Sequence, residues 1–362
     1  GPRGRTGPTR GGFDRQPPRP LFTTCPYSGG LRVVPLCVFS SALGMARLLL
    51  ASLLCHATVA TGLLPRINAA VIVPGFLSGA SDFKAMADTL TSRGIPAVVV
   101  PMPVWHWLPC LGGRSMRPML ERIDHTVRHL AANGGDVTSV PDFQYSPLDC
   151  WTDFRQTPGG IFFVGGSVEP DEYPVVEPRG TFPPASEPQG RVAIIGHSAG
   201  GWISRVYLSS RSYGGKAYGG ASLVHSFVTL GAPLADSAGP AFRGVAWTNR
   251  EDPPAVVRCL AVGATGTPGD SSGKLTLNAY SFCIDGGDGS KIDGDGVTPT
   301  FSSVALPGAE TLVLDGVTHF PWSDVFGGPQ FAPELAEDHR NGKPWYGTPE
   351  TVERWALWLE KQ

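Results

Sequence analysis

The alternation of apolar and polar positions predicts strands and helices in turn from residue 67 onward. Short apolar runs bounded by turn residues are typical of strands buried on both faces. Such runs occupy residues 69–73, 97–100, 192–195, 222–230, 256–262 and 311–314. Apolar residues spaced three and four apart predict helices at 82–92 and 116–132, after residue 201, and from residue 348 onward. This order predicts an α/β protein with a mostly parallel central sheet and helices on both faces.

The first strand–helix–strand unit has clear boundary signals. Ser81 is expected to cap its helix and Gly94 to end it. A strand, a helix and a second strand at this spacing predict a right-handed crossover between parallel neighbours. In the next helix, Pro118 fits the first turn, where a missing N–H costs nothing.

The stretch 191–207, RVAIIGHSAGGWISRVY, carries the strongest chemical signal in the chain. An apolar strand runs into Gly196-His197-Ser198-Ala199-Gly200, and a helical pattern follows. A G-x-S-x-G sequence between a strand and a helix is the nucleophile elbow of α/β-hydrolases, so it predicts Ser198 as a nucleophile. The glycines leave room for the sharp turn, and His197 is expected to point away along it. The alternative is an ordinary strand–helix connection.

A serine nucleophile needs a base, and elbow hydrolases present nucleophile, acid and base in that chain order. The chain has eight histidines. Only His319, in the segment TLVLDGVTHFPW, directly follows a strand beyond the elbow. We therefore predict His319 as the base.

The acid is expected between the elbow and His319. Asp295, in the loop DGDGVTP, is the preferred candidate because glycines flank it and its loop lies in the expected order. Asp293 is the second choice. Asp236 is the third, because some hydrolases place the acid one strand earlier.

An oxyanion hole requires two backbone N–H groups near the nucleophile. Position predicts one from Ala199, directly after the serine, and one from Phe76, in the loop PGFLSG after the first strand. A plain turn is the alternative for that loop.

Residues 136–188 interrupt the strand and helix pattern with a stretch rich in Pro, Gly and aromatic residues. It is too long for a simple connection and too apolar for a disordered linker. Since it precedes the elbow strand, we expect a lid-like insertion. A surface excursion with its own small apolar cluster is the alternative.

The charge balance separates the N-terminal segment from the rest. The formal net charge is −2, but residues 1–66 contain eight arginines and one acid, Asp14, for a net +7, which leaves −9 for the remainder. An Arg-rich, acid-poor segment predicts a targeting presequence, and residues 45–62 resemble a secretory signal. A signal peptide alone, a transit peptide and a two-part plastid presequence with a secretory-type signal are all open, so a plastid (chloroplast) destination is expected, with secretion as the alternative. A core helix at 48–64 is the alternative. No basic excess points to nucleic acid.

Metal and cofactor motifs are incomplete. The segment 269–275 lacks the first glycine and the final Ser/Thr of a phosphate-binding loop, and the acidic run 285–296 fails the spacing of a calcium loop. Three of the seven cysteines, Cys25, Cys37 and Cys55, precede residue 67, and the other four fit no zinc pattern. These four could form one disulfide, whose partners the sequence does not assign; they are Cys110, Cys150, Cys259 and Cys283.

From residue 69 to the C-terminus the chain resembles a family of plant and algal α/β-hydrolase-fold proteins that are usually plastid-directed and described as lipase-like. The resemblance is carried by these segments: PGFLSGASDF, EYPVVEPRGTFP, GHSAGGWISRVYLSSR, GGKAYGG, LVHSFVTLGAPL, GDSSGKLT, DGDGVTP, VTHFPWSDVFGG and PWYG. It implies a triad at Ser198, Asp295 and His319. Leu77 and Ser78 depart from the glycines of many lipase oxyanion loops.

The sequence thus predicts a serine hydrolase that cleaves carboxylic esters, lipid-like ones foremost, through an acyl-enzyme. No metal or organic cofactor is required. The expected partner is a small ester or a lipid, with peripheral membrane contact and no nucleic acid, and the oligomeric state is open. An amidase or thioesterase, or a non-catalytic scaffold of the same fold that binds an apolar ligand or protein, are the alternatives.

Overall fold

The computed structural model describes residues 67–102, 104, 107, 116–141, 191–238, 242–270, 273–320 and 341–361. The predicted presequence 1–66 lies outside the described residues. So do Cys110, Cys150 and residues 142–188 of the predicted insertion. Within the described part of the chain, no helix is long and apolar enough to cross a membrane.

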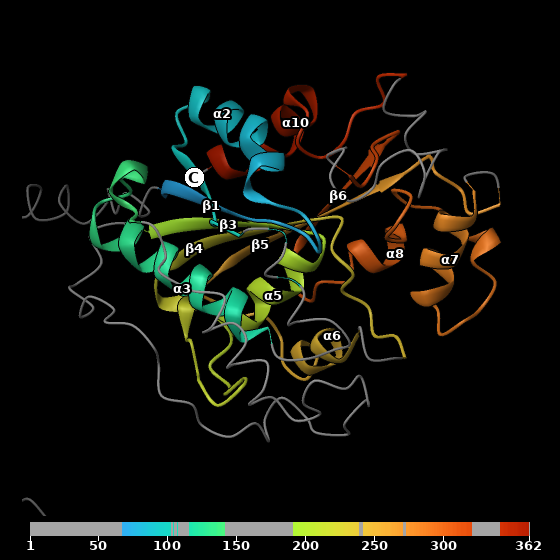
Figure 1. The fold of residues 1–362 in the computed structure, drawn as a ribbon, viewed down its shortest axis with the longest axis horizontal. Coiled ribbons are helices and arrows are strands. Elements are labelled where there is room, and N and C mark those ends of the chain that lie inside the picture. The colour runs from blue at the N-terminus through green and yellow to red at the C-terminus, as the bar shows by residue number, and fades with distance from the viewer. Residues whose placement is uncertain are drawn as a thin grey trace, which may run out of the picture. The chain divides into compact units, whose positions relative to one another are not determined.

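Six strands form one sheet in the order β2-β1-β3-β4-β5-β6, and every neighbouring pair is parallel (Figure 1). The strands are β1 (Ile67–Val73), β2 (Ala97–Val99), β3 (Arg191–His197), β4 (Val224–Leu230), β5 (Arg258–Thr265) and β6 (Glu310–Asp315). The prediction of an α/β protein with a mostly parallel sheet is confirmed. Each predicted strand lies within a few residues of an observed one.

The strand order reverses between β1 and β3. The chain first adds β2 on one side of β1 and then builds β3 to β6 on the other. Loops that leave the carboxyl ends of strands at such a switch point diverge, and in open parallel sheets the crevice between them is where ligands bind. The loop after β1 and the turn after β3 are the two loops at this point.

Helices cover both faces of the sheet, as predicted (Figure 1). On one face, α3 (Arg117–Ala132) and α5 (Ala199–Leu208) pack over the side chains of Val192 and Ile194. On the other, α2 (Lys84–Ser92) and α10 (Pro349–Glu360) pack over Ala193 and Ile195. Because successive strand residues point to opposite faces, burial on both sides explains the apolar runs of inner strands such as β1 and β3, whereas the edge strand β6 is largely exposed.

The start of the first helix differs from the prediction. A 3₁₀ turn, η1 (Ala80–Phe83), precedes α2. The carboxylate of Asp82 accepts a 2.9 Å hydrogen bond from the Gly79 amide, so Asp82 caps this end, whereas Ser81 was the predicted cap. The predicted first turn of α3 is confirmed, with Pro118 in its second position.

Three short helices were not predicted: α6 (Arg243–Thr248), α7 (Lys274–Phe282) and α8 (Thr300–Ser303). α6 and α8, with six and four residues, are too short to show a clear helical period. Two of the four cysteines considered for a disulfide, Cys259 and Cys283, are among the described residues, and both are buried free thiols.

Candidate active site

The elbow turn lies between β3 and α5. Ser198 has φ 51° and ψ −125°, a left-handed conformation that is strained for a residue with a side chain. The flanking glycines are required by contact: a Cβ on Gly196 would lie 2.6 Å from the Gly200 carbonyl oxygen, and one on Gly200 would lie 2.3 Å from the Val73 carbonyl oxygen. The turn is therefore locked against the end of β1, with Ser198 half-buried directly before the N-terminus of α5.

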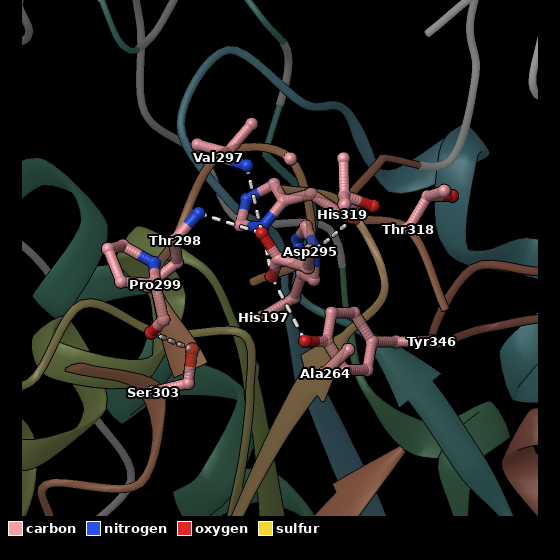
Figure 2. Close-up of polar contacts among 12 residues, drawn as sticks. His197, Ala264, Asp295, Val297, Thr298, Pro299, Ser303, Thr318, His319 and Tyr346 are labelled. Carbon is pink, nitrogen blue, oxygen red and sulfur yellow. Dashed lines mark hydrogen bonds and ion pairs between the residues drawn. The ribbon is translucent and has the colours of Figure 1, made fainter. Parts of the chain in front are cut away.

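The structure brings Asp295 and His319 together (Figure 2). His319 Nδ1 lies 2.8 Å from Asp295 Oδ2, and the His319 amide donates to the Asp295 carbonyl at 2.9 Å. Both residues are buried, Asp295 fully and His319 to 2 % exposure. A carboxylate accepts only, so Nδ1 carries the proton in this contact. Whenever the ring is neutral, Nε2 is therefore the proton acceptor, which is the tautomer that a general base needs.

Asp295 is itself held in place by its own loop. Its Oδ1 accepts hydrogen bonds from the amides of Val297 at 3.0 Å and Thr298 at 2.7 Å. Figure 2 shows both amides pointing at the carboxylate. These bonds fix the carboxylate, so its second oxygen is available to the imidazole.

The other two candidate acids do not contact His319. Asp293 accepts hydrogen bonds from the amides of Gly266 and Thr267 at 2.9–3.1 Å. It therefore ties the acid loop to the end of β5. Asp236 accepts from Asn249 Nδ2 at 2.8 Å, away from the histidine.

His197 links the elbow to the histidine loop. Its Nε2 donates to the His319 carbonyl at 2.8 Å, and the two rings lie 4.8 Å apart. Burial, followed by the proximity of His319, lowers the pKa of His197 well below its usual value, so the ring is neutral. The side chain of His197 was expected to point away from the nucleophile along the turn. In the structure it contacts the backbone of His319, so the residue before the nucleophile holds the loop of the predicted base.

No hydrogen bond joins Ser198 Oγ to His319 within the described part of the chain. Nucleophile–base hydrogen bonds are often long without substrate and shorten when it binds. The described residues therefore show a formed acid–histidine pair, which is connected to the elbow through the contact of His197 with the His319 carbonyl.

The predicted oxyanion loop lies against the nucleophile. A Cβ on Gly75 would be 2.8 Å from Ser198 Cβ. The Ser78 amide donates to the Gly75 carbonyl at 3.1 Å, which closes a turn with Leu77 at φ 58°. Neither Phe76 N nor Ala199 N donates to a backbone carbonyl within the described residues. With this positive φ, Leu77 adopts a conformation that favours glycine.

Two residues of this region were missed by the sequence reasoning. Tyr346 donates its hydroxyl to Asp295 Oδ2 at 3.0 Å, from a segment beyond the histidine (Figure 2). Gly231, directly after β4, has φ 57°, and a Cβ there would lie 2.5 Å from the same oxygen. Nothing in the order of triad motifs points to either. The only sequence signal was that PWYG and the glycine after β4 belong to the segments that carry the family resemblance.

A metal site is not evident: the described residues contain no group of three or more His, Cys, Asp or Glu side chains that could hold an ion. The two described thiols are also unsuited to nucleophilic work. Burial raises the pKa of Cys259 to about 11 and that of Cys283 to about 12.

Comparisons with known proteins find similarity among solved structures but none among family models or curated sequences. Among solved structures, the chain is similar to a variant of a pyrethroid hydrolase, with 14% identity over 82% of this chain and all of the other, at a TM-score of 0.30. At this similarity the function must be argued from the side chains themselves.

Proposed function

We propose that the chain is a serine hydrolase of the α/β-hydrolase fold that cleaves carboxylic esters, with lipid-like esters as the substrate class. The buried Asp295–His319 pair beside the strained Ser198 turn carries the proposal. A scaffold that only binds a ligand has no need to bury a carboxylate and align it on a histidine. This observation therefore favours catalysis over the non-catalytic alternative.

In the proposed reaction, His319 Nε2 takes the proton of the Ser198 hydroxyl as the oxygen attacks the ester carbonyl. Asp295 keeps Nδ1 protonated and stabilises the imidazolium that forms. The imidazolium then gives its proton to the departing alcohol. Water, activated by the same nitrogen, hydrolyses the acyl-enzyme and restores Ser198.

The amides of Ala199 and Phe76 are the proposed donors to the tetrahedral oxyanion. Ala199 N lies at the start of α5, where backbone N–H groups lack helical partners and the helix dipole favours negative charge. Phe76 lies in the turn that contacts Ser198. Two preorganised donors of this kind stabilise charge that develops only in the transition state.

The preference for lipid-like esters is supported by the apolar surface beside the nucleophile. Phe76 is 40% exposed, and its ring packs edge-on against Trp107, with centroids 5.4 Å apart. Trp107 itself is fully buried, and its indole N–H donates to the Ser78 carbonyl. The exposed face of Phe76 thus offers a rigid surface for an acyl chain.

A panel of p-nitrophenyl esters with increasing acyl length, together with an anilide and a thioester of the best acyl group, tests the proposal. We expect ester hydrolysis in the wild type and a loss of at least about 10³-fold in kcat for Ser198→Ala. Ser204→Ala is the matched control and should retain activity, because Ser204 lies in α5, the helix that follows Ser198, and is buried with its hydroxyl donating to the Gly200 carbonyl. Faster turnover of the anilide or thioester would reassign the bond that is cleaved, and equal rates in Ser198→Ala and the wild type would overturn the mechanism.

A further inference from the structure

The hydroxyl of Tyr346 completes the shell of donors around Asp295. A carboxylate has about four acceptor positions on its two oxygens. In Asp295, Oδ1 accepts from the amides of Val297 and Thr298, while Oδ2 accepts from His319 and Tyr346. All four positions are therefore filled, and Tyr346 and the histidine share one oxygen.

The position of Tyr346 is fixed from both sides. Its carbonyl accepts a 3.0 Å hydrogen bond from the Trp355 indole in α10, and the neighbouring Trp345 forms a parallel bridge with Thr318, the residue before the predicted base. The ring is fully buried and lies against Gly231, where a Cβ would be 2.7 Å from it. Tyr346 thus reaches Asp295 from a rigid segment that also sets the histidine loop.

Tyr346 is held as a donor. Burial, followed by the charge of Asp295 and the hydrogen bond to it, raises the pKa of Tyr346 well above its usual value. The phenol therefore keeps its proton over the whole range in which a hydrolase works. It can only donate this proton to the carboxylate, because Asp295 offers no hydrogen of its own when ionised.

We propose that Tyr346 is a positioning residue for the acid–base pair: its hydroxyl fixes Asp295 Oδ2 on His319 Nδ1 and takes up part of the carboxylate charge. The proposal rests on the proposed function of Ser198, Asp295 and His319. A donor on the shared oxygen has two effects. It limits rotation of the carboxylate, and it weakens the pull of Asp295 on the imidazolium, so that more of the base is neutral at a given pH.

The test compares Tyr346→Phe with the matched control Tyr280→Phe in the full chain. Tyr280 is as buried as Tyr346, and its hydroxyl also contacts the loop that carries Asp295. It does not bond the carboxylate: it accepts from the Gly296 amide and donates to the Thr267 carbonyl, both at 2.8 Å. The measured quantity is the second-order rate of labelling by a fluorophosphonate across pH. For Tyr346→Phe we expect a plateau about tenfold lower. We also expect the acid limb of this pH profile, the range in which the labelling rate rises with pH, to move by about half to one pH unit to higher pH.

The direction of the displacement separates positioning from a general structural role. Tyr280→Phe should lower stability without moving the acid limb. Replacing Tyr346 by 3-fluorotyrosine, which keeps its size and strengthens the donor, should move the limb to lower pH, and this variant keeps the test available if Tyr346→Phe does not fold. An acid limb that stays in place in both Tyr346 variants, or moves equally in Tyr280→Phe, would overturn the proposal.

A readout independent of activity distinguishes this inference from the proposed function. The proton between His319 Nδ1 and Asp295 is expected to give a downfield ¹H resonance that His319→Gln removes. This resonance should shift in Tyr346→Phe and not in Tyr280→Phe. If the wild type is not labelled at all, the proposed function fails, while the resonance still shows whether Tyr346 acts on the pair.

Discussion

Gly231→Ala tests the geometry of the candidate site from a residue that does no chemistry. The backbone there has φ 57°, and an added Cβ would lie 2.5 Å from Asp295 Oδ2 and 2.7 Å from the Tyr346 ring. The methyl group and the carboxylate oxygen must separate by about 0.9 Å to reach the 3.4 Å at which ordinary contacts begin. This displacement acts on the oxygen that bonds His319.

Two costs add in this variant. A left-handed conformation costs a residue with a Cβ about 1–2 kcal/mol. Weakening a hydrogen bond to a buried charged group costs about 1.5–3 kcal/mol more. We therefore expect Gly231→Ala to lose about 2.5–5 kcal/mol of unfolding free energy. Through the misplaced Asp295, we also expect a loss of about 10²-fold in labelling rate.

Gly308→Ala is the matched control. Gly308 has φ 70°, and an added Cβ would meet nothing within 4 Å, so only the conformational cost applies. Urea unfolding followed by tryptophan fluorescence should show a loss of about 1–2 kcal/mol, with labelling unchanged. Equal losses of stability in the two variants, or normal labelling in a folded Gly231→Ala protein, would refute the reasoning.

Three further predictions follow from the same contacts. Asp295→Asn should lower kcat by about 10⁴-fold by favouring the wrong histidine tautomer, whereas Asp293→Asn should mainly loosen the loop; similar kcat losses would contradict the assignment. His197→Phe, which removes the donor to the His319 carbonyl, should lower the labelling rate about tenfold. Because the folded pKa of His197 is lowered, its contribution to stability is present above about pH 6.5 and is lost as the pH falls, so this variant should flatten the acid side of a stability–pH curve. Burial, partly opposed by Arg205, raises the pKa of Cys259 from 9.0 to about 11, so stability should fall by about 3 kcal/mol between those pH values, and less in Cys259→Ala.

The sheet could be predicted because its strands leave an unambiguous pattern. Runs such as 69–73 and 192–195 are apolar at every position, short and rich in Val and Ile, which favours strands buried on both faces. The short helices left no comparable signal. α6 has six residues and α8 has four, which is too few for a helical period to emerge.

The acid and histidine loops could be ranked by chain order, and the structure shows Asp295 and His319 in contact. Sequence order could not reveal that Asp293 anchors the acid loop instead of contacting His319. Its hydrogen bonds to Gly266 and Thr267 depend on how the loop folds back onto β5. Tyr346 was equally hidden. Its contact with Asp295 joins residues 51 apart, through a segment that carries no catalytic motif.

The most direct measurement is the site of covalent modification by a fluorophosphonate. After reaction of the full chain and digestion with trypsin, we expect a single adduct on Ser198 in the peptide 192–205, with tandem mass spectrometry separating it from Ser204. Ser198→Ala should carry no adduct, and Ser204→Ala should be labelled like the wild type. An adduct that persists in Ser198→Ala, or a folded wild-type protein that is never labelled, would contradict the account.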